Sequence, residues 1–555
     1  MQERQARKIS VEEIASIVDA TDEIVRAAVK SASERTDGGK NIDSWQVHSE
    51  RVAYVATEAL AARAMLDYAR GAVAAGIDAG VLVDEAAVYA GEVAARLCGQ
   101  MVAAGSDFAL PQGLFDRTLG SAAIRERIEA CASEDRIRSI GRATASQRGA
   151  NNAWMPEDDV VMVRDSVRSF AQKEVAPLAE RIHRHDELVP DTLIRAMADM
   201  GYFGMSAPET YGGLGMGNLA MIITTEELSR VSLAAAGSLI TRPEILTKAL
   251  LKGGTEEQKK KWLAPVSAGE IMVGISVTEP NTGSDVASVA CRAEPAEVGG
   301  RSGWLINGAK AWCTFAGRAN VLALLARTNP DLKTGARGLS LFIVEKDAFD
   351  GHEFEMRQPT GGVLHGKADA TPGYRGMHSY TLAFENYFVP SENLIGGEGG
   401  LNKGFYLQMN GFAAGRLQTG GRATGLAQAA LEAAAAYAID RKQFGSALVD
   451  FQLTQYKLGR MATATQVARQ ITYRAARAMD ADETISLEPA MAKLLACDVA
   501  VAVTQEGQLL HGGWGYAEEY PISRYVVDAT VLPIFEGVKP VLELKVIARQ
   551  LLAAS

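Results

Sequence analysis

Ser276-Val277-Thr278-Glu279-Pro280-Asn281-Thr282-Gly283-Ser284-Asp285 leads from a short apolar strand into a polar turn. Residues 274–277 predict the strand, and Pro280 ends it because proline has no backbone N–H to donate to a strand ladder. The turn residues present backbone N–H groups and hydroxyls at one spot. Taken alone, the same residues fit a glycine-rich turn in an ordinary β-domain equally well.

A second polar segment lies further along the chain. Residues 304–314 are predicted to form a hairpin with Asn307-Gly308 as its turn, because Asn-Gly is a strong signal for a two-residue hairpin turn. This hairpin would place the indole of Trp312 and the hydroxyl of Thr314 beside the first loop. Plain strand packing is the alternative role for Trp312.

The spacing of apolar residues predicts how the chain is divided. It follows period two from 271 to 395, which predicts strands, and it is helical after Gly404, over 404–440, 450–480 and 487–510. The fold class is therefore mainly α with a central β-domain, in the order helix, sheet, helix, plus an extra N-terminal helical domain. The expected domains are 1–150 (extra helical), 151–270 (helical), 271–400 (β-barrel-like) and 401–555 (helical bundle).

The front of the chain begins with a capping box, Ser10-Val11-Glu12-Glu13, which predicts a helix that residues 36–40 end. Further helices are predicted over 43–75, 81–105 and 112–145, with a linker over 142–156. These segments carry no acid–base or metal constellation, so packing or assembly is their expected role.

The composition limits the classes of partner. A formal net charge of −10 in 555 residues argues against nucleic acid. Five cysteines without CxxC spacing indicate a reducing compartment, and residues 2–8 are charged with no apolar segment behind them. No apolar run approaches a membrane span, so a cytoplasmic protein is expected. His365, His378 and His511 lack metal-ligand spacing, so no metal is expected.

The turn of Val277-Thr278-Glu279-Pro280 with Gly283-Ser284-Asp285, and four separated motifs that follow it in order, resemble those of the acyl-CoA dehydrogenase family. The four are the Trp312 and Thr314 segment, Asp440-Arg441-Lys442-Gln443-Phe444-Gly445, His511-Gly512-Gly513, and Phe535-Glu536-Gly537. The resemblance covers residues 157–555. The long helical front is similar to that of members acting on (2S)-methylsuccinyl-CoA.

The resemblance implies FAD as the cofactor, with the residues that hold it. Thr278, Gly283, Ser284, Trp312 and Thr314 would contact the flavin ring and ribityl chain, with Thr314 near N5. Arg441 and Phe444 match the family's Arg-x-x-Phe-Gly, which reaches FAD across a subunit boundary, and an arginine fork suits a pyrophosphate. Gly512 and Gly513 would allow close backbone approach to that pyrophosphate.

Glu536 is the predicted catalytic base. By resemblance it takes the α proton of an acyl thioester, and Phe535 and Ile534 would partly desolvate its carboxylate. Some family members place the base just before an arginine in the C-terminal domain, but here that slot, before Arg416, is Gly415. A structural carboxylate at a helix start is the alternative for Glu536.

Two departures from the family concern the adenosine half of FAD. Leu509 stands where glutamine is usual, with Gln508 one residue away, and Val538-Lys539-Pro540 follows Glu536-Gly537 where the family has Thr-x-Gln. Both remove polar contacts to the adenosine, which leaves the chemistry itself untouched.

Thr241, Arg242 and Arg416 are the predicted substrate-binding residues. In the family that the chain resembles, the helix after a Glu-Leu-x-Arg segment, here residues 227–230, lines the acyl pocket. A gap-free count from there to Gly254 would put Thr241 and Arg242 at its far end. A buried cation there needs a partner, so Arg242 is expected to pair with a second carboxylate, as in methylsuccinyl-CoA. Pairing with Glu244, or an orientation toward solvent, is the alternative.

The expected function is FAD-dependent α,β-dehydrogenation of a short branched or dicarboxylic acyl-CoA, with hydride transfer to flavin N5. Methylsuccinyl-CoA would give mesaconyl-CoA, and an electron-transfer flavoprotein would accept the electrons. A homo-oligomer is expected, and a dimer if the front domain covers the surface by which shorter relatives form tetramers. An acyl-CoA oxidase using O2 and a flavin-free scaffold remain alternatives.

Overall fold

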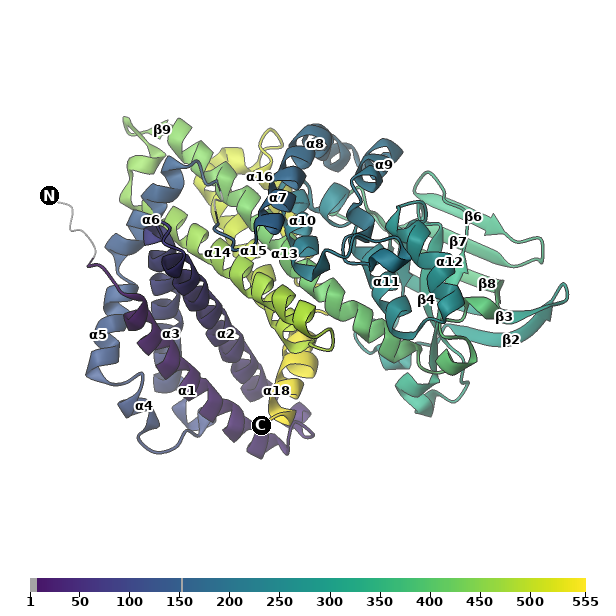
Figure 1. Ribbon diagram of the computed structural model, residues 1–555, viewed down its shortest axis with the longest axis horizontal. Coiled ribbons are helices and arrows are strands. Elements are labelled where there is room, and N and C mark those ends of the chain that lie inside the picture. The colour runs from purple at the N-terminus through teal and green to yellow at the C-terminus, as the bar shows by residue number, and fades with distance from the viewer. Residues whose placement is uncertain (1–6, 151–152) are drawn as a thin grey trace. The chain divides into compact units, whose positions relative to one another are not determined.

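The computed structural model describes residues 7–150 and 153–555 (Figure 1). The charged start of the chain, residues 1–6, and Asn151-Asn152 of the expected linker lie outside the described residues. The chain forms two compact units, one of residues 1–157 with 419–555 and one of residues 158–418. Within the described ranges, no helix is both long enough and apolar enough to cross a membrane.

The first unit is built from helices at the two ends of the chain. Ser10 caps its first helix as predicted, because Ser10 Oγ accepts from Glu13 N at 3.2 Å and Ser10 N donates to Glu13 Oε2 at 2.9 Å. Its helices are α1 (Val11–Thr36), α2 (Gln46–Ala74), α3 (Gly80–Phe108), α4 (Leu114–Arg117), α5 (Ala122–Cys131), α6 (Glu134–Ser146), the end of α13 (Gly404–Asp440), α14 (Gln452–Ala481), α15 (Leu487–His511), α16 (Ile522–Ala529), α17 (Lys539–Val541) and α18 (Arg549–Ala553).

Within this unit the N-terminal helices share a core with the C-terminal ones. Figure 1 shows α1, α2 and α3 alongside one another and next to α14. Gly141 on α6 and Gly459 on α14 let the two backbones touch, since a Cβ on Gly141 would lie 1.8 Å from Gln455 O. The α1 residue Ser33 also donates to Leu552 O on α18 at 2.6 Å. The front bundle therefore belongs structurally to the C-terminal bundle.

The second unit combines helices with one large sheet. Its helices are α7 (Asp158–Phe170), α8 (Ala176–His185), α9 (Asp191–Asp199), α10 (Gly217–Val231), α11 (Thr241–Gly253), α12 (Glu256–Ser267) and the first part of α13. The strand order is β1-β4-β2-β3-β8-β7-β6, with β5 paired to β4. The strands are β1 (Val273–Ser276), β2 (Arg292–Val298), β3 (Arg301–Thr314), β4 (Val321–Arg327), β5 (Leu339–Glu345), β6 (Glu353–Arg357), β7 (Val363–Ala368) and β8 (Ser379–Pro390).

The apolar pattern of the strands accounts for their burial. All seven residues of β4 are buried, and β5 is buried up to its last residue. They form one core with α11, α12 and Ile395. Helical, β and helical segments follow one another along the chain after an extra helical front, which confirms the predicted fold class.

One local prediction is wrong. Asn307-Gly308 is not a hairpin turn, because β3 runs unbroken through it and pairs with β2, with Arg292 opposite Asn307. The turn lies at Gly299-Gly300, where both residues have positive φ (60° and 76°), as a two-residue hairpin turn demands. The helical segment predicted over 112–145 consists of three helices, α4, α5 and α6.

Candidate active site

In the second unit, the polar turn after β1 is fixed by a buried ion pair. Lys310 on β3 is fully buried, and its Nζ donates to Glu279 Oε1 and to Val277 O, both at 2.9 Å. The same carboxylate accepts from the N–H groups of Ala290 and Cys291. A buried charge must be paired and hydrogen-bonded to be tolerated, and both ions here meet that demand. The pair holds Thr278 in place while the turn beyond it, at Gly283 and Ser284, stays exposed.

A bulge in β3 turns Trp312 outward. The pairing of β3 with β8 shifts register between Lys310 and Cys313, and Trp312 has a φ of 57°. Its side chain is 60% exposed, so the alternative of plain strand packing does not hold. Bulges are known to re-aim a side chain next to active sites. The bulge presents an indole face next to the polar turn after β1. The backbone N–H of Ala311 donates to Thr278 O of that turn at 2.8 Å, which holds the two segments together.

Thr314 ends β3 and faces β8. Its Oγ1 lies 2.9 Å from the hydroxyl of Ser379, and the side chain is buried apart from a small exposed fraction. The structure thus brings together Thr278, Trp312 and Thr314, as the sequence predicts, although through a continuous strand and not through a hairpin.

Thr241 and Arg242 open α11, and both side chains are buried. Arg242 Nη1 donates to Tyr374 Oη at 3.1 Å and to Ser238 O at 3.3 Å. Glu244, the alternative partner, instead accepts from Ser206 Oγ at 2.5 Å and pairs with Lys248 at 3.8 Å. Among the described residues no carboxylate pairs with Arg242, which is 4% exposed. The guanidinium is therefore a buried cation without an anionic protein partner.

Three potential metal ligands lie close together in the second unit. Single ligand atoms of Asp186, His352 and His378 lie within 4.8 Å of one another. The Asp186 carboxylate already faces two other groups, Arg375 Nε at 3.3 Å and His378 Nε2 at 3.2 Å. Burial lowers the pKa of His378, which favours its neutral form. Because Arg375 already balances the charge of the Asp186 carboxylate, this cluster of three residues supplies no argument for a metal-dependent reaction.

In the first unit, Glu536 lies in the loop between α16 and α17. It has a φ of 54°, a conformation that non-glycine residues rarely adopt and that collects at functional sites. Its Oε2 is buried and has no hydrogen-bond partner within the described part of the chain. A carboxylate oxygen without a protein donor is free to accept a proton. Glu536 precedes α17 by three residues and does not cap it, which argues against a merely structural role at a helix start.

The loop around Glu536 is held from two helices. Lys493 Nζ on α15 donates to Gly537 O at 2.7 Å, and Cys497 Sγ lies 3.4 Å from Leu532 O. On the other side, the guanidinium of Arg422 on α13 stacks over the Phe535 ring at 4.7 Å. Lys493 and Arg422 are both buried cations, so the loop sits among positive groups that would attract its carboxylate.

Arg441, Phe444, Gly512 and Gly513 gather at one end of the first unit. Arg441 follows α13 and opens a small hairpin, β9 (Lys442–Gln443) with β10 (Ser446–Ala447), whose tip exposes Phe444 by 96%. One turn before Arg441, Tyr437 stacks on His511 with ring centroids 4.3 Å apart. That stack brings the end of α13 beside Gly512 and Gly513, where an added Cβ would meet nothing within 4 Å.

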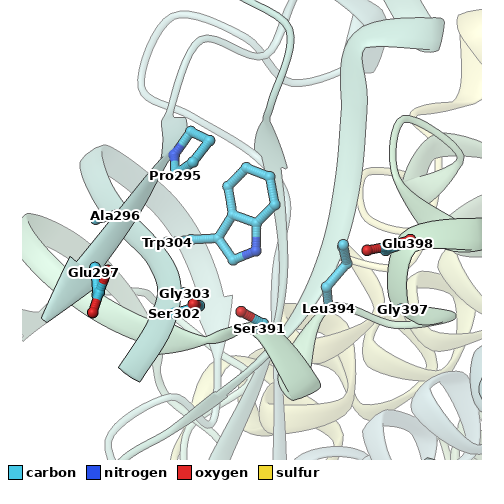
Figure 2. A pocket seen from close by; sticks show the side chains of 10 residues that line it. All are labelled: Pro295, Ala296, Glu297, Ser302, Gly303, Trp304, Ser391, Leu394, Gly397 and Glu398. Atoms are coloured by element: carbon cyan, nitrogen blue, oxygen red, sulfur yellow. The ribbon is translucent and has the colours of Figure 1, made fainter. Parts of the chain in front are cut away.

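The remaining predicted residue, Arg416, and a hollow in the second unit say less about the site. Arg416 lies half-buried in the part of α13 that belongs to the second unit. A hollow of about 490 Å³ opens between β2, β3 and the segment after β8, and Figure 2 shows the Trp304 ring projecting into it. None of the predicted site residues lines it, and Glu297 and Glu398 make its rim acidic.

Sequence reasoning missed Lys310 and Tyr374. Both act on partners more than 30 positions away, namely Glu279 and Arg242. A lysine inside a predicted strand, between Ala309 and Ala311, was a usable signal for the first. No local signal marks the second.

The residues present fit FAD. In the second unit, an exposed indole, the hydroxyls of Thr278 and Ser284 and an exposed polar turn suit a planar ring and a polyol chain. In the first unit, the exposed Arg441 beside two open glycines suits a pyrophosphate.

Comparison with known proteins gives a consistent result. Residues 157–270, 274–387 and 402–552 match models described as the N-terminal, middle and C-terminal domains of acyl-CoA dehydrogenase. Over 413 residues the chain is 43% identical to (2S)-methylsuccinyl-CoA dehydrogenase of Cereibacter sphaeroides, which covers 74% of this chain and 72% of that one.

Solved structures agree with this result. Butyryl-CoA dehydrogenase of Megasphaera elsdenii is similar with a TM-score of 0.64 and 30% identity, over 70% of this chain and 97% of that one. A chain from a structure described as an electron transferring flavoprotein of Acidaminococcus fermentans is similar with a TM-score of 0.64 and 30% identity, over 73% of this chain and 98% of that one.

Proposed function

Since this chain belongs to the acyl-CoA dehydrogenase family, and is thus a flavoprotein oxidoreductase that uses FAD, we propose (2S)-methylsuccinyl-CoA as its substrate and mesaconyl-CoA as its product. The substrate class is a short branched or dicarboxylic acyl-CoA. One observation carries this choice: Arg242 is buried at the start of α11 and no carboxylate of the described chain pairs with it.

Glu536 is the proposed base that removes the α proton of the thioester. Its Oε2 lacks a protein donor, and the strained backbone aims the side chain in a direction that an ordinary helical or extended residue would not. FAD, when bound, accepts the hydride that leaves Cβ. Thr278, Gly283, Ser284, Trp312 and Thr314 are proposed to hold its ring system, and Arg441, Phe444, Gly512 and Gly513 of a partner subunit its pyrophosphate.

Arg242 is the proposed determinant of the acyl group. A guanidinium binds a carboxylate with two parallel hydrogen bonds, and one that is already desolvated does so at little further cost. The methylsuccinyl group carries a free carboxylate beyond the thioester, and Thr241 would add a hydroxyl beside it. Arg416 is proposed to contact the substrate from α13.

Three further assignments follow from the family. An electron-transfer flavoprotein is the proposed electron acceptor, supported by the likeness to the Acidaminococcus fermentans structure. The protein is proposed to work as a dimer in the cytoplasm, where its five free cysteines would stay reduced.

The test is the variant Glu536→Gln, which keeps the shape of the side chain and removes the base. We expect the variant to purify with bound FAD, and its flavin absorbance to be bleached by (2S)-methylsuccinyl-CoA at least about 100-fold more slowly than that of the unmodified protein. Glu519→Gln, a change at an exposed neighbouring acid, should leave the rate unchanged. Undiminished bleaching in Glu536→Gln would refute the assignment.

A further inference from the structure

The segment that follows Glu536 is tied to a helix by a lysine. Lys539 opens α17, three residues after Glu536, and its Nζ donates to Asp498 Oδ2 on α15 at 2.6 Å. The pair is partly buried, with 36% and 25% of the two side chains exposed. Together with the bond from Lys493 to Gly537 O, it fixes the loop immediately after Glu536 at two points.

The same carboxylate oxygen also binds the N-terminal helices. Tyr54, in the middle of α2, donates its hydroxyl to Asp498 Oδ2 at 2.8 Å. Its ring lies under Lys539 as well, with Nζ 5.1 Å from the ring centroid. Tyr54 is thus in contact with both members of the ion pair. Burial and the neighbouring Asp498 charge raise the pKa of Tyr54 well above its usual range, so the hydroxyl keeps its proton and stays a donor.

The backbone at Glu536 needs such support. A non-glycine residue with positive φ costs of the order of 1–3 kcal/mol, and persists only where its surroundings hold it. Without Tyr54, Asp498 would keep Lys539 as a partner but lose the donor that orients its carboxylate. Lys539 would lose the ring beneath it. The loss of the Asp498 donor and the loss of the ring beneath Lys539 both weaken the attachment of Lys539, which lies three residues after Glu536.

We propose that Tyr54 is a positioning residue for Glu536: through Asp498 and Lys539, the extra N-terminal helices hold the loop of the catalytic base in its reactive conformation. The proposal rests on the assignment of Glu536 as the base. It gives the front bundle a part in catalysis as well as in packing.

The test compares two tyrosines of the same helix. Tyr54→Phe removes the hydroxyl that Asp498 accepts, and Tyr68→Phe removes a hydroxyl on α2 that accepts from Trp154 N at 2.9 Å. Each change deletes one partly or fully buried hydrogen bond, so both should lower thermal stability to a similar extent. Turnover is measured per bound flavin over a range of (2S)-methylsuccinyl-CoA concentrations with an artificial electron acceptor, and Asp498→Asn serves as a second variant.

We expect Tyr54→Phe and Asp498→Asn to reduce kcat by about 10-fold, with KM and FAD content nearly unchanged, because small displacements of a reacting group slow the chemical step. The isotope effect of deuterium at the substrate α carbon should increase in both, since proton removal becomes more fully rate-limiting. Tyr68→Phe should match the unmodified protein in both measurements.

Equal rates and isotope effects in Tyr54→Phe and Tyr68→Phe would overturn the proposal. That result is distinct from failure of the assigned function. If Glu536→Gln is still bleached rapidly, the base is wrong; if Glu536→Gln is inert while Tyr54→Phe is normal, only the positioning role is wrong.

Discussion

At the scale of single residues, Arg242 and Glu536 share one property: a polar group lacks a complementary partner among the described residues. In the part of the chain that the structure describes, Arg242 has no carboxylate beside it, and Glu536 Oε2 has no hydrogen-bond donor. An unpaired buried charge is strongly destabilising, and such a group is retained where a ligand completes it. Arg242 can therefore bind an anion, and Glu536 Oε2 can accept a proton. The two residues therefore predict a substrate with one acidic carbon and one free carboxylate.

The prediction for Arg242 concerns substrate choice. Arg242→Gln keeps a donor for Tyr374 and loses the charge, so kcat/KM for (2S)-methylsuccinyl-CoA should fall by about 100-fold or more, as for a buried charge pair that loses one partner. Butyryl-CoA, which lacks the second carboxylate, should be affected only a few-fold. Tyr374→Phe is the control, because it removes one contact of Arg242 and leaves the cation. An equal loss on both thioesters would contradict the role of Arg242.

At the scale of elements, packing of the front bundle on the C-terminal bundle creates a buried acid. Glu85 on α3 is 7% exposed, and its Oε2 has no hydrogen-bond partner among the described residues. Burial raises the pKa of Glu85 to about 8, against the opposing charge of Arg469 on α14. The interface between these helices therefore holds a proton near neutral pH.

This proton makes stability depend on pH. Below pH 4.5 the carboxyl is neutral in the folded and unfolded chains, and it contributes no difference. As the pH rises toward 8, the unfolded chain loses the proton and the folded chain keeps it, so stability falls and then levels off above 8. The raised pKa corresponds to a loss on the order of 5 kcal/mol, at about 1.4 kcal/mol per unit.

Glu85→Gln should remove the loss of stability that Glu85 causes as the pH rises. We expect its unfolding free energy, measured with urea between pH 4.5 and 8.5, to be less dependent on pH and higher than that of the unmodified protein at pH 8.5. Glu126→Gln, at an exposed site on α5, should leave the pH dependence unchanged. An unchanged pH dependence in Glu85→Gln would mean that burial does not raise the pKa of Glu85.

At the scale of the molecule, the N-terminal helices cover part of the C-terminal bundle. In the first unit α6 and α2 lie on α14, and α1 lies on α18, so these helix faces are not open to a second molecule. Three exposed aromatic side chains of the C-terminal part of this unit, Phe444, Trp514 and Tyr516, lie outside these covered faces. Exposed apolar surface marks contact sites, and Phe444 is the most exposed of the three.

The expected assembly is a dimer formed around the 441–447 hairpin. Light scattering should give the mass of two chains, and Phe444→Asp should shift the protein toward monomer and lower its flavin content, because Arg441 and Phe444 are proposed to reach FAD in the partner. Val102→Asp, at an exposed apolar residue on α3, should change neither. A tetramer, or a dimer that Phe444→Asp leaves intact with full flavin, would contradict this arrangement.

Local signals in the sequence predicted what depends on neighbours along the chain. The capping box at Ser10 and the periods of α13, α14 and α15 are set by hydrogen bonds and burial within a few residues, and the structure has them where they were expected. The spaced motifs identified the family, and with it FAD and the class of reaction.

Tertiary structure decided whatever depends on residues far apart in sequence. Gly299-Gly300 and Asn307-Gly308 both satisfy turn chemistry, and only pairing with β2 and β8 selects the first. The burial of Arg242 beside Tyr374, the Glu279–Lys310 pair and the bond from Tyr54 to Asp498 join positions 31 to 444 residues apart. No local propensity encodes such contacts, because their energy comes from groups that folding alone brings together.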